Sequence, residues 1–190
     1  MLRNTRSDVV RAAGRMFAER GYHGTSMREL GRELGLLGSS LYAHIDSKED
    51  LLVEVVDRGA ALFTEAAERA LAAADTASGR LRALIAGHID VILEHRDVVR
   101  TFLNEARMLD DAHRLRVVAA RDGYEAQFRS VIAAGVDSGE FKTGADPKLA
   151  SIFTLSVLNA VERWYRTEGE LDRSALVDEL YRFVVAALIA

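Results

Sequence analysis

The chain contains no cysteine and a single proline in 190 residues, and only 7% of its residues are aromatic. Without cysteine it can have no disulfide framework, no thiolate metal site and no thiol nucleophile. With proline so rare, long stretches are free to be helical, because proline is the strongest helix breaker. Alternating Val, Ile and Thr runs bounded by Asn-Gly or Asp-Gly turns are also missing. The fold class is therefore predicted to be all-α.

Long apolar runs are missing too. The longest apolar stretches fall far short of the roughly 20 residues that a membrane span needs. No apolar run follows the N-terminal arginines, so a signal peptide is not expected. The lack of cysteine fits a reducing compartment. We therefore expect a cytoplasmic protein with no membrane partner.

The charge is unevenly distributed along the chain. The formal net charge is −4 at pH 7, which by itself argues against a nucleic-acid partner. Residues 1–48, however, hold eight Lys or Arg against five Asp or Glu, or +3, so the remaining 142 residues carry −7. A basic end on an acidic body is the asymmetry expected when only one part of a protein meets phosphate.

Helical periodicity and capping residues divide the chain into about nine helices. The first three are predicted over Ser7–Arg20 (with Ser7 as the cap), Met27–Leu34 (with Ser26 and Glu29 as a capping box) and Ser39–Ile45. The remaining six are predicted over residues 48–74, 80–95, 97–107, 110–138, 147–166 and 172 to the C-terminus. This division predicts a small head of residues 1–47 and a larger body of residues 48–190.

The last two predicted helices are apolar on most sides. A helix of this kind has to be covered on both faces, and a chain this small covers only one of them itself. Two such helices from each of two subunits would form a four-helix interface, so we predict a homodimer through the last two helices. A buried C-terminal hairpin in a monomer is the alternative interpretation.

Two short helices separated by a tight glycine turn between Met27 and Ile45 have the dimensions of a helix-turn-helix. The residues around them resemble the N-terminal signature of the TetR family over about residues 7–52. The resemblance rests on Ala18–Tyr22, on Thr25–Met27 and above all on Gly35–Leu51, which reads GLLGSSLYAHIDSKEDL. It implies a DNA-binding head, a ligand-sensing helical body, and a double-stranded DNA operator as partner.

A recognition helix presents small or polar residues at its N-terminal end to reach base edges in the major groove. Gly38, Ser39 and Ser40 fit this role, whereas Leu41 and Ile45 should point inward. The resemblance adds backbone and phosphate contacts from other positions, and the expected DNA-binding residues are Thr25, Ser26, Gly38, Ser39, Ser40, Tyr42, His44 and Lys48.

Other interpretations of these positions stay open. Tyr42 also fits a half-buried core aromatic, and His44 and Lys48 fit solvated side chains. Arg3 and Arg6 fit either a basic arm that reaches a neighbouring groove or a frayed end. The family often has Ser where Leu37 stands and Lys or Arg where Gly38 stands, which suggests weaker phosphate anchoring or a shifted cap here.

The body resembles, more loosely, the branch of the family that responds to fatty acyl-CoA or related thioesters. The likeness rests on Arg107, Arg121–Glu125, Gly139–Phe141, Leu158–Asn159 and Trp164–Tyr165. An apolar tunnel is predicted to be lined by Leu62, Phe63, Ile85, Ile89, Ile92, Phe102, Leu103, Phe128 and Phe153. Arginine suits nearby phosphates because its planar head carries several donors. The candidate ligand-binding residues are Phe63, His88, Ile92, Phe102, Arg107, Arg121, Phe128 and Asn159.

The same apolar positions also fit a plain core, and His88 fits a hydrogen-bonded core histidine. Asn159 needs partners if it is buried, and it suits either a ligand or the dimer interface.

The expected function is a transcriptional regulator, most simply a repressor released from its operator by a small-molecule effector. An acyl-CoA thioester is the favoured effector, and a multidrug-type sensor of hydrophobic cations in the same fold is the alternative. We find no Ser/His/Asp arrangement with a supporting motif, no phosphate loop and no recognised metal spacing. Enzymatic activity, a metal and a cofactor are therefore not expected.

Overall fold

The computed structural model describes residues 5–36, 41–42, 45–142 and 146–189. Within these ranges it contains helices and no strands, which confirms the all-α prediction. The α-helices are α1 (Arg6–Arg20), α2 (Met27–Glu33), α4 (Lys48–Ala72), α5 (Ala77–Glu94), α6 (Arg96–Asn104), α7 (Asp111–Ser138), α8 (Pro147–Trp164) and α9 (Arg173–Ile189). Most of the helix predicted over Ser39–Ile45 lies outside the described residues.

The helices begin and end where local chemistry satisfies their free backbone groups. Thr5, and not Ser7 as predicted, caps α1, because its hydroxyl accepts the Asp8 N–H and the Asp8 carboxylate accepts the Thr5 N–H. The capping box of Ser26 and Glu29 at α2 is confirmed. Gly21 follows α1 with a φ of 73°, a conformation that other residues rarely adopt.

Two bounds in the body differ from the prediction for identifiable reasons. Helix α5 begins at Ala77 because the Glu140 carboxylate accepts the N–H groups of Ala77 and Ser78, at 3.0 and 2.9 Å. These backbone hydrogen bonds lower the pKa of Glu140, the one from Ser78 most of all. The segment predicted over 97–107 is α6 followed by a separate 3₁₀-helix, Ala106–Met108.

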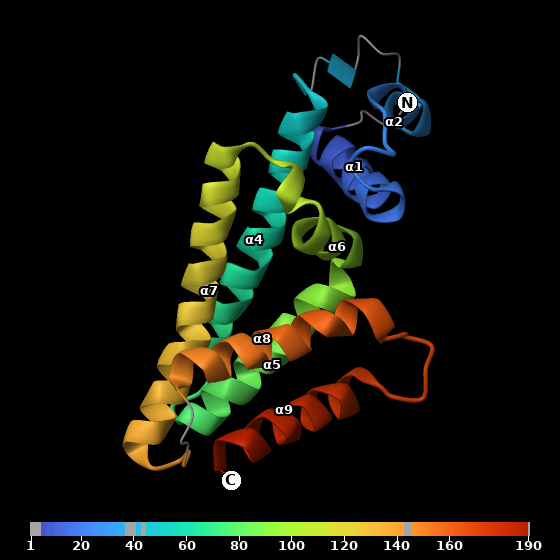
Figure 1. The fold of residues 1–190 in the computed structure, drawn as a ribbon. Coiled ribbons are helices and arrows are strands. Elements are labelled where there is room, and N and C mark those ends of the chain that lie inside the picture. The colour runs from blue at the N-terminus through green and yellow to red at the C-terminus, as the bar shows by residue number, and fades with distance from the viewer. Residues whose placement is uncertain (1–4, 37–40, 43–44, 143–145, 190) are drawn as a thin grey trace. The chain divides into compact units, whose positions relative to one another are not determined.

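The chain forms two compact units that do not follow chain order. The first comprises Met1–Ala61 and His95–Ala119. In it α1 packs against α2 and α6 (Figure 1), and the buried Thr101 hydroxyl of α6 donates to the carbonyl of Gly14 in α1 at 3.2 Å. Gly59 of α4 lies so close to Phe102 that an added Cβ would come within 2.7 Å of the Phe102 Cβ.

The second unit comprises Leu62–Glu94 and Ala120–Ala190. Here α5 packs against both α8 and α9, and α8 also contacts α9 (Figure 1). Leu84, Ile85 and Ile89 of α5 are fully buried or nearly so in its core. Helices α4 and α7 contribute to both units, whereas the sequence places its division between residues 47 and 48; that functional boundary stays a prediction.

None of the helices within the described ranges is long and apolar enough to cross a membrane.

Candidate DNA-binding head and a buried polar cluster in the body

The described part of the predicted recognition segment has an inward and an outward side. Leu41 and Ile45 are buried, at 0% and 2% exposure, as the sequence predicts. Leu41 lies over α2, where its Cδ2 would be 3.8 Å from a Cβ added at Gly31. Tyr42 between them is 55% exposed, so it is not the core aromatic of the alternative interpretation. Its ring is available to a partner at this surface.

Lys48, the first residue of α4, is held against an aromatic ring. Its ammonium lies 4.2 Å from the centroid of the Tyr22 ring, a cation–π contact. Partial burial lowers the pKa of this ammonium. Tyr22 itself packs on Phe17 of α1, and its backbone N–H donates to the Glu105 carboxylate at 3.0 Å. Lys48 is therefore a positioned cation and not a freely solvated one.

Three other head residues are tied into the fold. The Thr25 hydroxyl is buried and donates to the carbonyls of Met16 and Gly21, so in this structure it packs the turn and is not presented to phosphate. Ser26 caps α2 and stays exposed. Arg6 pairs with Glu54 of α4, which ties it to the first unit and not to a free basic arm. Gly38, Ser39, Ser40 and His44 lie outside the described residues.

In the second unit, three helices bring neutral polar groups together inside an aromatic core to which α4 also contributes. His88 of α5 is 2% exposed, and its Nδ1 lies 3.0 Å from the hydroxyl of Tyr124 in α7. The His88 ring packs on Phe63 of α4 with centroids 4.7 Å apart, and the Tyr124 ring meets Phe128 edge-on at 5.5 Å. Burial lowers the pKa of His88 to about 3, and Asn159 of α8 partly offsets this fall. The ring is therefore neutral at pH 7.

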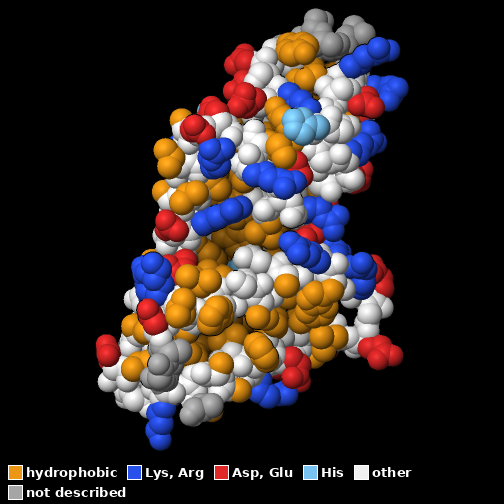
Figure 2. All heavy atoms as spheres, in the orientation of Figure 1, with side chains coloured by type: hydrophobic (Ala, Val, Ile, Leu, Met, Phe, Trp, Pro, Cys, Tyr) orange, Lys and Arg blue, Asp and Glu red, His pale blue; other side chains and the backbone are white. Residues whose placement is uncertain are grey.

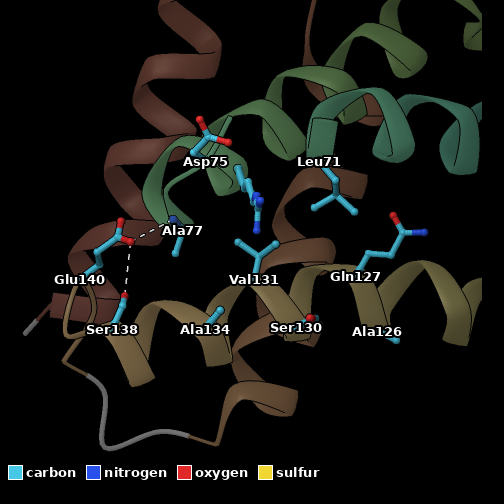
Figure 3. A pocket seen from close by; sticks show the side chains of 11 residues that line it. Leu71, Asp75, Ala77, Ala126, Gln127, Ser130, Val131, Ala134, Ser138 and Glu140 are labelled. Atoms are coloured by element: carbon cyan, nitrogen blue, oxygen red, sulfur yellow. Dashed lines mark hydrogen bonds between the residues drawn. The ribbon is translucent and has the colours of Figure 1, made fainter. Parts of the chain in front are cut away.

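A pocket of about 640 Å³ opens in the same unit, between the end of α4, the start of α5 and the second half of α7. Its wall includes Gln127, which lies on α7 one turn after Tyr124, together with Asp75 and Arg80 (Figure 3). Glu140 closes one end, where it caps α5 and accepts from the Ser138 hydroxyl at 3.3 Å. Polar and charged side chains alternate with small apolar ones in its wall, so the pocket offers both hydrogen-bonding groups and apolar surface to a small molecule.

The structure distributes the predicted ligand residues over both units. In the second unit Phe63, His88, Ile92 and Phe128 are buried, Asn159 is partly buried, and Arg121 is exposed. Phe102 and Arg107 belong to the first unit, where Phe102 is buried and Arg107 is exposed. Phe153 was predicted to line the tunnel, but it is 63% exposed on the outer side of α8.

The outer side of α8 and α9 is a continuous apolar face, which we call the α8/α9 face. Hydrophobic side chains gather over these two helices in Figure 2. Phe153 and Phe183 are the most exposed, at 63% and 64%, and a small hollow of about 110 Å³ lies between them and their neighbours. The exposed large hydrophobic residues of this face are Leu149, Ile152, Phe153, Trp164 and Phe183.

Comparison with known families decides the identity of this architecture. Residues 9–55 match the family model of bacterial regulatory proteins of the tetR family, and residues 74–188 match the tetracyclin repressor-like C-terminal domain. The chain belongs to the TetR family. As a TetR-family protein it is a DNA-binding transcriptional regulator with a ligand-responsive body.

Individual TetR-family proteins are similar over nearly the whole chain. PfmR from Thermus thermophilus is 30% identical, with a TM-score of 0.86 over 96% of this chain and 99% of that one. The fatty acid metabolism regulator protein of Bacillus subtilis is 23% identical, covering 95% of this chain and 93% of its own. AibR, solved with isovaleryl coenzyme A and operator DNA, has the same fold, with a TM-score of 0.87 and 23% identity over 97% and 99%.

Sequence reasoning missed several members of these sites. Tyr124 and Phe128 are four apart on α7, which indicates one helix face, but nothing in that spacing points to His88 on another helix. Gln127 reads as an ordinary solvated residue of an amphipathic helix. Tyr22 belongs to the family signature, but the sequence does not indicate its contacts with Lys48 and Glu105, which join residues far apart in the chain.

Proposed function

We propose that this TetR-family regulator is a homodimeric repressor that leaves its operator when an acyl-CoA thioester binds in the second unit. The observation that carries the effector class is the aromatic core around His88 and Tyr124, which is neutral and lies in the same unit as an open pocket. An apolar acyl chain suits the aromatic walls, and a neutral thioester suits the uncharged polar groups. The fatty acid regulator and the CoA-bound AibR support the same class.

The DNA-binding surface is proposed to centre on Tyr42 and Lys48 and to include Ser26 and, from the sequence alone, Gly38, Ser39, Ser40 and His44. Tyr42 is exposed and Lys48 is held at the start of α4, so both can meet the phosphate backbone. Phosphate contacts of this kind position the protein on any sequence, whereas base contacts from the recognition segment select the operator. Two heads per dimer would then read two half-sites about one helical turn apart.

The dimer is proposed to form through the α8/α9 face. Exposed patches of this kind on a single chain mark interaction sites, because burying them is favourable. An isologous interface places the same face of each subunit against itself, so one apolar surface is enough to form it.

A thermal-shift panel tests the effector class. The purified protein is heated with isovaleryl-, octanoyl- and palmitoyl-CoA, with the matching free acids, with CoA alone and with cationic dyes. A ligand at a hundredfold excess over its Kd should add about 2.7 kcal/mol of stability. Stabilisation by a thioester, together with release of a DNA duplex selected from a random pool, is the expected result. Stabilisation by cationic dyes alone would replace the thioester with a hydrophobic cation.

Fluorescence anisotropy on the selected duplex tests the head. Lys48→Ala should weaken binding on every sequence and reduce the salt dependence by about one counterion. Tyr42→Ala should weaken binding by removing a contact to the backbone. Lys142→Ala removes the same charge from an exposed site in the second unit and serves as the control. Unchanged DNA binding in both head variants would refute this assignment.

A further inference from the structure

Two buried side-chain atoms in the described part of the chain have no hydrogen-bond partner, one on α5 and one on α7. They are Nε2 of His88 and Oε1 of Gln127. His88 is joined to α7 through Tyr124, and Gln127 follows Tyr124 by three residues, a rise of about 4.5 Å along the helix. Buried polar atoms are nearly always paired, so each such exception asks for a reason. One unpaired nitrogen on α5 and one unpaired oxygen on α7, linked through Tyr124, match the polar groups of a single ligand.

The hydrogen-bond pattern defines what His88 offers to a ligand. The neutral ring carries one proton, and its Nδ1 is engaged by the Tyr124 hydroxyl. We assign that hydroxyl as the donor, which leaves the ring proton on Nε2. Asn159 raises the pKa of the His88 ring, as a hydrogen-bond acceptor does. It does not, however, complete a hydrogen bond to Nε2 at normal geometry. His88 therefore presents a buried N–H donor.

We propose that the Nε2–H of His88 binds the carbonyl oxygen of the effector's acyl group, while the acyl chain lies among the rings of Phe63 and Phe128. This inference rests on the proposed acyl-CoA effector and names the atom that recognises its thioester. Beyond the thioester, an ethylene spacer leads to the first amide N–H of the pantetheine arm. Gln127 at the pocket wall offers the acceptor for that N–H.

The same cluster selects against the free acid. His88, Tyr124, Gln127 and Asn159 are all uncharged at pH 7, so no cation among them compensates a carboxylate. Burying an ionised carboxylate without a cation costs far more than burying a thioester carbonyl that accepts one hydrogen bond. A thioester is therefore expected to bind more tightly than the acid with the same chain.

A ligand that lacks only the carbonyl provides the sharpest test. The tightest of isovaleryl-, octanoyl- and palmitoyl-CoA is compared by calorimetry with the S-alkyl-CoA thioether of the same chain length. In the wild type the thioester is expected to bind about tenfold more tightly than the thioether, which corresponds to about 1.4 kcal/mol. In His88→Asn the amide stops near the Nδ1 position, and the ratio should fall to about one. In His88→Gln the amide N–H reaches the Nε2 position, and the preference should remain.

Controls separate a loss of recognition from a loss of fold. Each variant is first shown to melt cooperatively and to bind the selected duplex. His113→Gln, in the first unit, is the matched control and should keep the wild-type ratio of thioester to thioether affinity. If His88→Asn does not fold, His88→Phe removes the donor at similar volume and takes its place. A wild-type ratio in the folded Asn or Phe variant would overturn the carbonyl contact while leaving the acyl-CoA effector in place. If no CoA thioester binds the wild type at all, both the proposed effector and the proposed contact between His88 and its carbonyl are refuted.

Discussion

The hydroxyl of Tyr124 and Nδ1 of His88 lie 3.0 Å apart inside an aromatic core that holds both groups uncharged. Burial lowers the pKa of His88 to about 3 and raises that of Tyr124, so the histidine is unprotonated and the tyrosine protonated at pH 7. A pair of this kind recognises a neutral polar group by direction and not by charge. It therefore links the stability of the second unit to pH and supports the proposed preference of this site for ligands with an uncharged carbonyl.

The first prediction concerns this pH dependence. The pKa of His88 is about 3 in the folded protein and near 6.5 when exposed, so between these values the unfolded chain binds more protons. The His88 contribution to stability is thus fully present above pH 6.5 and declines as the pH falls toward 3. From pH 7.5 to pH 5 the free energy of unfolding should fall by about 2 kcal/mol from this residue. Urea unfolding at pH 7.5, 6 and 5 measures it.

His88→Gln removes the titrating ring while keeping a polar side chain, so its stability should change less over the same pH range. His113→Gln leaves the buried histidine in place and should keep the loss of stability that His88 causes between pH 7.5 and pH 5. Parallel curves for the wild type and His88→Gln would contradict the assignment of this pH dependence to His88.

The second prediction compares two glycines of α7. A Cβ added at Gly135 would lie 2.2 Å from the buried ring of Phe141, so Gly135→Ala should destabilise the protein by about 1–3 kcal/mol. At Gly123 an added Cβ meets nothing within 4 Å, and Gly123→Ala should stabilise α7 by up to about 1 kcal/mol through helix propensity. Urea unfolding of the two variants measures both changes. Equal effects would mean that the contact with Phe141 does not restrict this position.

Helix positions and types were largely predictable, because they follow from local chemistry. Ser26 and Glu29 form their capping box as predicted, and Pro147 opens α8 behind its Asp146 cap. The start of α5 was missed by three residues, since the group that caps its first turn is Glu140, which is distant in the chain.

The candidate sites were predicted only in part, for the same reason. The inward direction of Leu41 and Ile45 follows from spacing along one helix. The partner of His88, by contrast, depends on how α5 and α7 pack, which periodicity does not specify. The sequence also predicts Phe153 of α8 in the tunnel wall, although it is exposed. The sequence alone does not distinguish an apolar residue that faces the core from one that faces a partner.

The third prediction concerns the α8/α9 face. Phe183→Glu places a charge on this apolar face and should convert the proposed dimer into a monomer, because the like charges would meet unpaired and desolvated across an isologous interface. Operator affinity should fall with it, since the two heads are no longer joined. Sedimentation and anisotropy on the same samples measure both effects. Leu115→Glu is the matched control: Leu115 is 69% exposed on α7, in the first unit, and its substitution should leave the dimer intact.

The last prediction concerns a residue of the first unit, Glu105 at the end of α6, that lies outside the head and its proposed DNA contacts. The Glu105 carboxylate accepts the backbone N–H of Tyr22 at 3.0 Å, and the Tyr22 ring in turn supports the Lys48 ammonium. Glu105→Ala leaves that N–H without its acceptor and loosens the ring beneath Lys48, so operator affinity should drop several-fold. Glu105→Gln keeps an oxygen acceptor at the same reach and should retain most of the affinity, although it removes the same charge. Anisotropy on the selected duplex measures the affinity of both variants. An equal loss of affinity in both would assign the effect to the charge of Glu105. No loss in either would mean that Lys48 is positioned without Tyr22.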